Sequence, residues 1–270
     1  MAQPVPNTGL VTDAMKTLHA DEGYMILEGV IPPDMLDLLR EECAYFLGYC
    51  DGQMDAAGEA TQGLSHRGKR YFISNQYRLS SRMWRFIFSP LMAEIASSVL
   101  GDSVCLFHEQ WVIKGAEQGM KFAWHQDSGY VKNRDPDTTH PPYLTCWCNL
   151  DDVSENNGTV FLLPHSRGNS RDTIHSHVRE EGTNDLIGFS GDDPGIPITV
   201  PAGSIVAFTS YNFHRSGANT SEAMRRVYLP QYSGSPIARA DGDGLWGMAV
   251  PFVADGHIVY DRDRDRATDG

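Results

Sequence analysis

The sequence contains no run of about 18 apolar residues, so no segment is long enough to form a membrane-spanning helix. Its first ten residues have neither the basic start nor the apolar stretch of a secretory signal peptide. Positive charge is also scarce, because 22 Lys and Arg face 35 Asp and Glu and leave a net charge of −13. Such an acidic chain is unsuited to nucleic acid or to an anionic membrane surface. We therefore expect a cytoplasmic protein that acts on a small-molecule substrate; its oligomeric state stays open.

Cysteine is sparse and odd in number, with five residues in 270. Three of them lie in apolar, strand-like runs, which predicts buried free thiols in a reducing compartment. Cys146-x-Cys148 could bind a metal, but no second Cys pair is present to complete a zinc site. The chain also lacks internal repeats, a G-x-G-x-x-G motif and a P-loop, so the common signatures of nucleotide-binding folds are missing.

Short β-rich segments separated by Gly, Pro, Asn and Asp fill the middle of the chain. They lie at 104–113, 122–127, 143–150, 159–163, 196–200, 204–209 and 226–232. This pattern predicts a β-sandwich or barrel with a core at about 103–233. With 41% hydrophobic residues, we expect a single domain over 1–270, with loose tails at 1–10 and about 260–270. Residues 170–195 are predicted to form a polar inserted loop.

Three helices are predicted, all before this β-rich region. They span about 12–23, 32–48 and 89–101, and each begins at a capping residue or a proline and ends at a glycine. Apolar residues recur at helical spacing in each of them. We expect these N-terminal helices to pack outside the sheet, and residues 51–70 to form a loop.

The stretch from Phe122 to Tyr130 carries the main chemical signal. If it is a strand, His125 and Asp127 point to the same face. An imidazole and a carboxylate at this spacing can bind one metal ion, and His214 offers a third ligand. Two His and one carboxylate on one side of a metal is the arrangement of non-haem Fe(II) oxygenases. A His-x-Asp pair by itself is common, so a solvated surface pair remains the alternative on this motif alone.

A positive charge is expected beside these ligands. Arg225 lies eleven residues after His214 and begins the next β-rich segment, so a hairpin would return it to the same wall. Its guanidinium could bind a carboxylate through paired hydrogen bonds. An Arg at the start of a strand is also commonly a solvated edge charge.

The segment Tyr143–Leu150 alternates clearly. Thr145 and Trp147 share one face with Tyr143 and Asn149, and Leu and Cys fill the other. A polar and aromatic face opposite an aliphatic face suits a barrel wall that lines a pocket.

Taken together, these motifs resemble the phytanoyl-CoA dioxygenase-like family of Fe(II)/2-oxoglutarate oxygenases. The resemblance runs from Asp21 to Tyr232 and rests on Trp124-His125-Gln126-Asp127 and on His214-Arg215-Ser216-Gly217-Ala218-Asn219 followed by Arg225. It implies a mainly β fold, a double-stranded β-helix (jelly roll, cupin-like). One departure is Leu163-Pro164-His165-Ser166-Arg167-Gly168, where the family often has Pro-Gly-Ser-His, so no role is assigned to His165.

The resemblance also implies cofactors and roles. Iron, Fe(2+), would be bound by His125, Asp127 and His214, with 2-oxoglutarate and O2 as co-substrates. Arg225 would bind the distal carboxylate of 2-oxoglutarate, and the residues expected to assist it or line the same site are Ser216, Trp147, Thr145 and Gln110. Related halogenases have a small residue where Asp127 stands, so the carboxylate favours hydroxylation. We therefore expect a dioxygenase that hydroxylates an unactivated C–H bond of a small molecule and releases succinate and CO2.

Four further residues are candidate substrate contacts, namely Tyr130, Trp111, His108 and Arg226. Core packing explains the aromatic ones equally well. The pair His175-x-His177 lies in the polar insert and is expected to be solvated.

Three alternatives remain. A metal-binding cupin-type barrel with non-oxidative chemistry would have no need for the keto-acid anchor Arg225 and Ser216, and a non-catalytic jelly roll would not require all three metal ligands. A hydroxylase of an acyl-CoA thioester is the third. The sequence leaves the substrate itself open.

Overall fold

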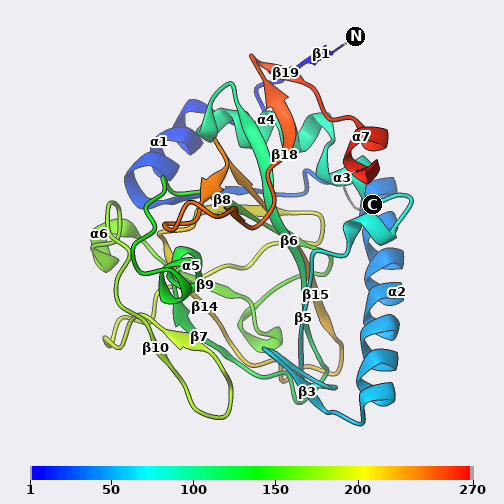
Figure 1. Cartoon of the computed structure of the whole chain (residues 1–270). Coiled ribbons are helices and arrows are strands. Elements are labelled where there is room, and N and C mark those ends of the chain that lie inside the picture. The colour runs from blue at the N-terminus through cyan, green and yellow to red at the C-terminus, as the bar shows by residue number, and fades with distance from the viewer. Residues whose placement is uncertain (1, 268–270) are drawn as a thin grey trace.

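The computed structural model describes residues 2–267 and consists mainly of two antiparallel β-sheets flanked by helices (Figure 1). The larger sheet has the strand order β1 (Gln3–Pro4), β19 (His257–Ile258), β18 (Val250–Ala254), β6 (Val104–Lys114), β15 (Arg225–Ser233), β8 (Leu144–Asn149), β13 (Ile205–Thr209), β2 (Tyr24–Leu27). Its β6 also pairs with β5 (Arg70–Ser74), which continues into β4 (Ser65–His66) and β3 (Thr61–Gln62). The smaller sheet has the order β12 (Ile196–Pro197), β9 (Val160–Leu163), β14 (Phe213–Ser216), β7 (Phe122–His125).

Successive strands alternate between the two sheets. The chain passes from β6 in the larger sheet to β7 in the smaller one, back to β8, across to β9, and later from β13 through β14 to β15. This winding of one ribbon through two facing sheets is the double-stranded β-helix. The predicted fold is confirmed.

The central strands of the larger sheet are buried on both faces, as all six residues of β8 show. On β8, Cys146 and Cys148 pack with the helices in the larger core, whereas Trp147 packs with Leu162 and Val206 in a second core between the sheets. The alternation predicted from the sequence therefore separates an outer face, covered by helices, from an inner face that surrounds a cavity. Helix α2 (Pro33–Ala57) runs along one side of the sheets (Figure 1).

The predicted helix ends are correct for two of the three helices. Helix α1 (Asp13–Glu22) is capped by Thr12 and ends at Gly23, and α4 (Pro90–Leu100) is capped by Ser89 and ends at Gly101. The expectation that the second helix ends at Gly48 is wrong, because α2 continues to Gly58, where φ is 67°. Burial of Cys50 and Met54 continues its apolar face and outweighs the cost of about 1 kcal/mol for a glycine inside a helix.

Several short elements complete the fold. They are η1 (Tyr77–Leu79), α3 (Trp84–Ile87), α5 (Asp127–Arg134), η2 (Glu155–Asn157), α6 (His165–Gly168), β10 (Val178–Arg179), β11 (Leu186–Ile187), β16 (Ile237–Ala238), β17 (Leu245–Trp246) and α7 (Arg262–Ala267). No helix in the described part of the chain is long and apolar enough to cross a membrane.

The expectation of loose tails is wrong for the described ends. Near the N-terminus β1 pairs with β19, and the Thr8 hydroxyl donates to the buried Glu94 carboxylate at 2.8 Å. Near the C-terminus the Tyr260 ring stacks on Phe88, and Asp265 of α7 accepts a hydrogen bond from the Tyr77 hydroxyl at 2.7 Å. These partners are distant in sequence, so composition could not reveal them. Residues 268–270 lie outside the described part, and the single-domain assignment stays a prediction.

Candidate functional site

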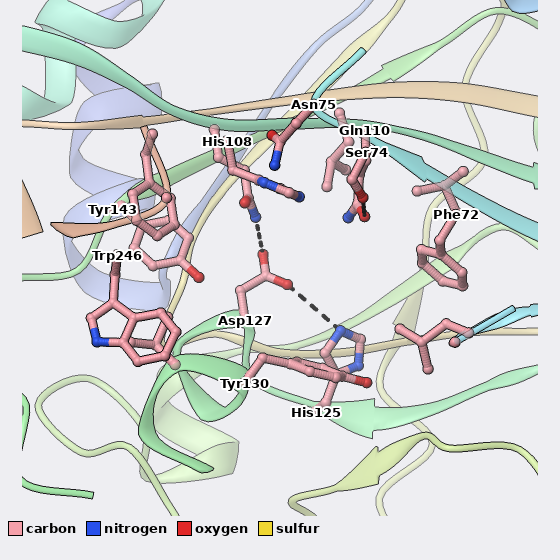
Figure 2. A pocket seen from close by; sticks show the side chains of 18 of the residues that line it. Phe72, Ser74, Asn75, His108, Gln110, His125, Asp127, Tyr130, Tyr143 and Trp246 are labelled. Atoms are coloured by element: carbon pink, nitrogen blue, oxygen red, sulfur yellow. Dashed lines mark hydrogen bonds and ion pairs between the residues drawn. The ribbon is translucent and has the colours of Figure 1, made fainter. Parts of the chain in front are cut away.

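His125 and His214 are cross-strand partners in the antiparallel pair of β7 and β14, with ring centroids 4.0 Å apart. Asp127 lies close to both imidazoles but on a different element. Strand β7 ends at His125, and Asp127 is the first residue of α5, so the expectation that the two share one strand is corrected. The turn at Gln126 directs the carboxylate towards both imidazoles, as Figure 2 shows for Asp127 and His125.

The three side chains present a metal-ligand set. Oδ1 of Asp127 lies 3.6 Å from Nε2 of His125 and 3.5 Å from Nε2 of His214, and all the ligand atoms lie within 4.8 Å of one another. This spacing suits one ion that each ligand approaches at roughly 2.0–2.2 Å.

Hydrogen bonds outside this set orient each ligand. Nδ1 of His125 faces the Ala123 carbonyl at 2.8 Å, and Nδ1 of His214 faces the Asn212 carbonyl at 3.1 Å. Because a carbonyl can only accept, each Nδ1 carries the proton and each Nε2 keeps its lone pair for a metal.

The second oxygen of Asp127 is held in a similar way. The Thr145 hydroxyl and the Gln231 amide donate to its Oδ2 at 2.6 and 2.9 Å, which leaves Oδ1 directed at the imidazoles. Thr145 lies in the site as expected, but its hydroxyl is bonded to Asp127. Gln231 was missed, although its place on the inner face of β15, two residues after Leu229, was a usable signal.

Asp127 and His214 are both in their metal-binding forms at physiological pH. Burial alone would raise the pKa of Asp127, but the imidazoles of His214 and His125 and the Thr145 hydroxyl outweigh it and lower that pKa to about 2. Burial lowers the pKa of His214 to about 3, so its imidazole is neutral at physiological pH. An ionised carboxylate and neutral imidazoles are the states that bind a metal.

Arg225 lies on the inner side of β15 and is 0% exposed. Its Nη1 donates to the Val112 carbonyl at 3.3 Å, whereas its Nε and Nη2 have no hydrogen-bond partner among the described residues. Burial lowers its pKa to about 9, against an opposing contribution from Asp151, so it stays charged. A buried guanidinium with free donors calls for an anionic partner, and a carboxylate is the anion that its fork fits best. The residues therefore fit both a bound metal and a bound dicarboxylate.

A cavity of about 680 Å³ is lined by His125, Asp127 and His214 and by Trp147, the ring beside Arg225. The expected residues that line it are His108, Gln110, His125, Asp127, Tyr130, Trp147, His214 and Ser216. Ser74 and Asn75 also line it, and Figure 2 shows both facing Asp127 from the opposite wall, together with His108 and Gln110.

A sequence model of the phytanoyl-CoA dioxygenase (PhyH) family matches residues 20–227, which is most of the chain. The chain belongs to the phytanoyl-CoA dioxygenase family. It is thus a non-haem iron, 2-oxoglutarate-dependent dioxygenase, with Fe(II) as cofactor and 2-oxoglutarate and O2 as co-substrates. This sets aside the alternatives of a non-oxidative barrel and of a non-catalytic jelly roll.

Individual relatives agree with this family assignment. The chain is 24% identical over 267 residues to phytanoyl-CoA dioxygenase domain-containing protein 1 of Danio rerio, covering 81% of this chain and 89% of the relative. It is 28% identical over 171 residues to L-proline trans-4-hydroxylase of Streptomyces griseoviridis, covering 55% and 62%.

Solved structures share the fold. EctD from S. alaskensis with 2-oxoglutarate and 5-hydroxyectoine superposes with a TM-score of 0.67 at 18% identity, covering 92% of this chain and 90% of that one. The epimerase SnoN from nogalamycin biosynthesis gives 0.64 at 20% identity, covering 93% and 96%.

Two residues expected to contact substrate lie outside the cavity of this PhyH-family chain. Trp111 points to the outer face of β6, where its ring centroid lies 4.3 Å from that of Tyr228. Arg226 forms an ion pair with Asp151 at 2.6 Å. The outward positions of both residues follow from the alternation along a strand, because successive residues point to opposite faces. His108, Gln110 and Arg225 occupy the inward positions.

The expectation that His177 is solvated is also wrong. Its Nε2 accepts from the backbone N–H of Gln126 at 3.0 Å, and its Nδ1 donates to the His175 carbonyl at 2.8 Å. A Cβ added at Gly129 or Gly188 would collide with its ring. In this PhyH-family site, His177 therefore supports the backbone between two of the candidate metal ligands.

Proposed function

We propose that the protein hydroxylates a compact small molecule, with Fe(II) held by His125, Asp127 and His214 and the distal carboxylate of 2-oxoglutarate bound by Arg225. The observation that carries this proposal is the state of Arg225. It is a fully buried charge with free donors on Nε and Nη2, and it lies beside Trp147, which lines the same cavity as the triad.

The chemistry that bound Fe(II) and 2-oxoglutarate supply is oxidative, with the keto acid converted to succinate and CO2 as one oxygen atom enters the substrate. The protein's own residues place these groups. Thr145 and Gln231 hold the Asp127 carboxylate, and Ser216 lines the cavity on β14, two residues after His214. Tyr130 packs against His125 with ring centroids 5.5 Å apart and shields that ligand from water.

Two points support hydroxylation over halogenation. Asp127 supplies a carboxylate where the related halogenases have a small residue, so a halide would have no open site beside the metal. Relatives of this chain include enzymes named L-proline trans-4-hydroxylase and ectoine dioxygenase, whose names describe oxygenation of small molecules.

A compact substrate has more support than an acyl-CoA thioester. The wall opposite the triad carries four polar side chains, Ser74, Asn75, His108 and Gln110. A long alkyl chain needs an apolar channel, because polar groups that it covers lose their hydrogen bonds to water. A cavity of about 680 Å³ is also in the range of small-molecule sites.

The test is an assay of succinate formation by the purified protein with Fe(II), 2-oxoglutarate, O2 and ascorbate, screened over a panel of small molecules. We expect succinate with wild-type protein, and with a true substrate a product heavier by one oxygen atom. Asp127→Ala should abolish turnover, and Asp137→Ala, which alters an exposed carboxylate, should not. Absence of iron binding and of succinate across the panel would overturn the proposal.

A further inference from the structure

The cavity differs in charge from the chain as a whole. The sequence carries a net charge of −13, yet the charged residues among the described cavity lining are three arginines and a single carboxylate, Asp127. Since Asp127 faces the two imidazoles, the rest of the lining presents only positive charge to an incoming molecule. A positive cavity within an acidic surface attracts anions selectively.

Two of these arginines lie at the opening, on different elements. Arg134 is the last residue of α5, and Arg239 follows β16 in the hairpin that β17 closes. Both side chains are exposed, and neither has a carboxylate partner among the described residues. The third, Arg215, packs on the Phe161 ring at 3.7 Å and donates to the Pro194 carbonyl. Arg134 and Arg239 are therefore the cations available to a ligand.

Asp135 fixes the hairpin to the end of α5. Its Oδ2 accepts from the Ala240 N–H at 2.9 Å and from the Trp246 indole N–H at 2.8 Å. The Arg239 guanidinium carbon lies 5.2 Å from the Trp246 ring centroid. This contact brings two cations and one aromatic face to the same cavity, and the Asp135 carboxylate forms no ion pair with either arginine among the described residues.

His108 lines the same cavity and is less exposed than these two arginines. On β6 it pairs with Gln231 of β15, the residue whose amide contacts Asp127. Burial lowers the pKa of His108 to about 4, against opposing contributions from Asp127 and Gln110, so this imidazole is neutral at physiological pH. A neutral imidazole provides one donor and one acceptor.

We propose that the substrate carries an oxyanion, a carboxylate or a phosphate-type group, that binds between Arg134 and Arg239. The rest of the molecule then lies along Trp246 and Tyr143 and presents a polar group to His108 beside the triad. This inference rests on the proposed function and specifies its substrate class. Binding between Arg134 and Arg239 keeps the substrate's charge away from Arg225, so that the substrate and 2-oxoglutarate bind to separate cations.

The test measures binding to anaerobic holoenzyme saturated with Fe(II) and 2-oxoglutarate, by isothermal titration calorimetry. The probes are benzoate and phenylacetate, each paired with its primary amide, and phenylphosphonate for the phosphate-type arm. We expect at least one acid to bind about tenfold or more tightly than its amide, because the neutral amide cannot form charge-assisted hydrogen bonds with the arginines. In the double variant Arg134→Gln/Arg239→Gln this preference should disappear, whereas Arg171→Gln, an exposed arginine outside the cavity lining, should retain it.

The outcomes separate this inference from the proposed function. Equal binding of acids and amides to wild-type holoenzyme, or no binding of either, overturns the oxyanion site. An acid preference that survives in the double variant also overturns it, because the charge then acts elsewhere. In every variant, substrate-independent succinate formation is measured in parallel. Succinate formation without an acid preference rejects only the oxyanion site. Absence of succinate formation in wild-type protein rejects the proposed function.

Discussion

The guanidinium carbon of Arg225 lies 5.1 Å from the centroid of the Trp147 ring, and two nitrogens of that guanidinium have no hydrogen-bond partner among the described residues. The ring stabilises the cation from one side through a cation–π interaction. The ring cannot replace the hydrogen bonds that Nε and Nη2 make to water in the unfolded chain. The pair therefore holds an unsatisfied charge in place, at a cost that a bound carboxylate would offset.

The first prediction is that Arg225→Met weakens 2-oxoglutarate binding without lowering the stability of the free protein. Loss of the charge pair should weaken 2-oxoglutarate binding by about 2–5 kcal/mol. The free protein should unfold at the same temperature or higher, because an uncompensated buried charge is gone. Thermal unfolding with and without 2-oxoglutarate measures both effects.

The neighbouring Arg226→Met is the matched control. Arg226 pairs with Asp151 outside the cavity, so its loss should leave the affinity for 2-oxoglutarate unchanged. Unchanged affinity in Arg225→Met would remove Arg225 from the co-substrate site.

A second prediction concerns the hydrogen bonds that orient Asp127. Thr145→Val removes a donor to its Oδ2 while keeping the shape of the side chain, and Gln231→Leu removes the other donor. Loss of such an outer hydrogen bond typically weakens metal binding about 10–100-fold. Titration of the apoprotein with Fe(II) under anaerobic conditions gives the affinity directly.

Thr209→Val serves as the control, because Thr209 lies on β13 and makes no contact with the triad. Equal iron affinity in Thr145→Val, Gln231→Leu and this control would show that the Asp127 carboxylate needs no external orientation.

The sequence was sufficient for residues whose role depends on residue type and spacing. The three candidate metal ligands and Arg225 were predicted in this way, and the structure places the three candidate ligand atoms within 4.8 Å of one another. Strand alternation also predicted that Thr145 and Trp147 face the cavity. The same reasoning failed for Trp111 and Arg226, because without the register of β6 and β15 the inward parity was unknown, and one step along a strand reverses the face.

Other features depended on tertiary contacts that no local pattern encodes. The end of α2 at Ala57 lies nine residues beyond Gly48, since burial against the sheet decides where the helix stops. Strand β5 was not predicted, because its partner β6 lies about forty residues further along the chain. His177 looked like a solvated loop residue until the insert was seen folded against Gly129.

A third prediction concerns the buried ion pair of Arg70 and Asp185, which ties the 170–195 insert to the barrel. The two residues share bonds of 2.7 and 3.1 Å, and Asp185 also accepts from the N–H of Ala123, whose carbonyl orients His125. Asp185→Leu should lower the free energy of unfolding by about 3–5 kcal/mol, because it leaves the Arg70 charge buried and unpaired.

The double variant Arg70→Met/Asp185→Leu should recover much of that loss, since no lone charge remains. Asp193→Leu, which breaks the exposed ion pair with Arg167, is the control and should change stability little. Denaturant unfolding of wild type, Arg70→Met, Asp185→Leu and the double variant gives the coupling energy. If the double variant is less stable than Asp185→Leu alone, Arg70 stabilises the fold by more than compensating the charge of Asp185.

The last prediction concerns pH and Glu109, which lies on β6 between the cavity-facing His108 and Gln110. Its side chain points to the outer core, where Oε1 accepts from the Tyr77 N–H at 3.0 Å and Oε2 has no partner among the described residues. Burial raises the pKa of Glu109 to about 7, against smaller lowering contributions from its hydrogen bonds. The folded state therefore holds this proton at pH values where the unfolded chain has released it.

The sign of the effect follows from this difference in proton binding. The contribution of Glu109 to stability is complete below about pH 4.5 and is lost as the pH rises through about 7. Glu109→Gln should thus raise the free energy of unfolding at pH 8 by on the order of 2–3 kcal/mol relative to wild type, and by little at pH 4.5. Glu94→Gln is the matched control, because the Glu94 carboxylate accepts from Thr8 and Leu10, and it should destabilise the protein at pH 8. A Glu109→Gln protein that is less stable than wild type at pH 8 would mean that ionised Glu109 has a favourable partner in the core.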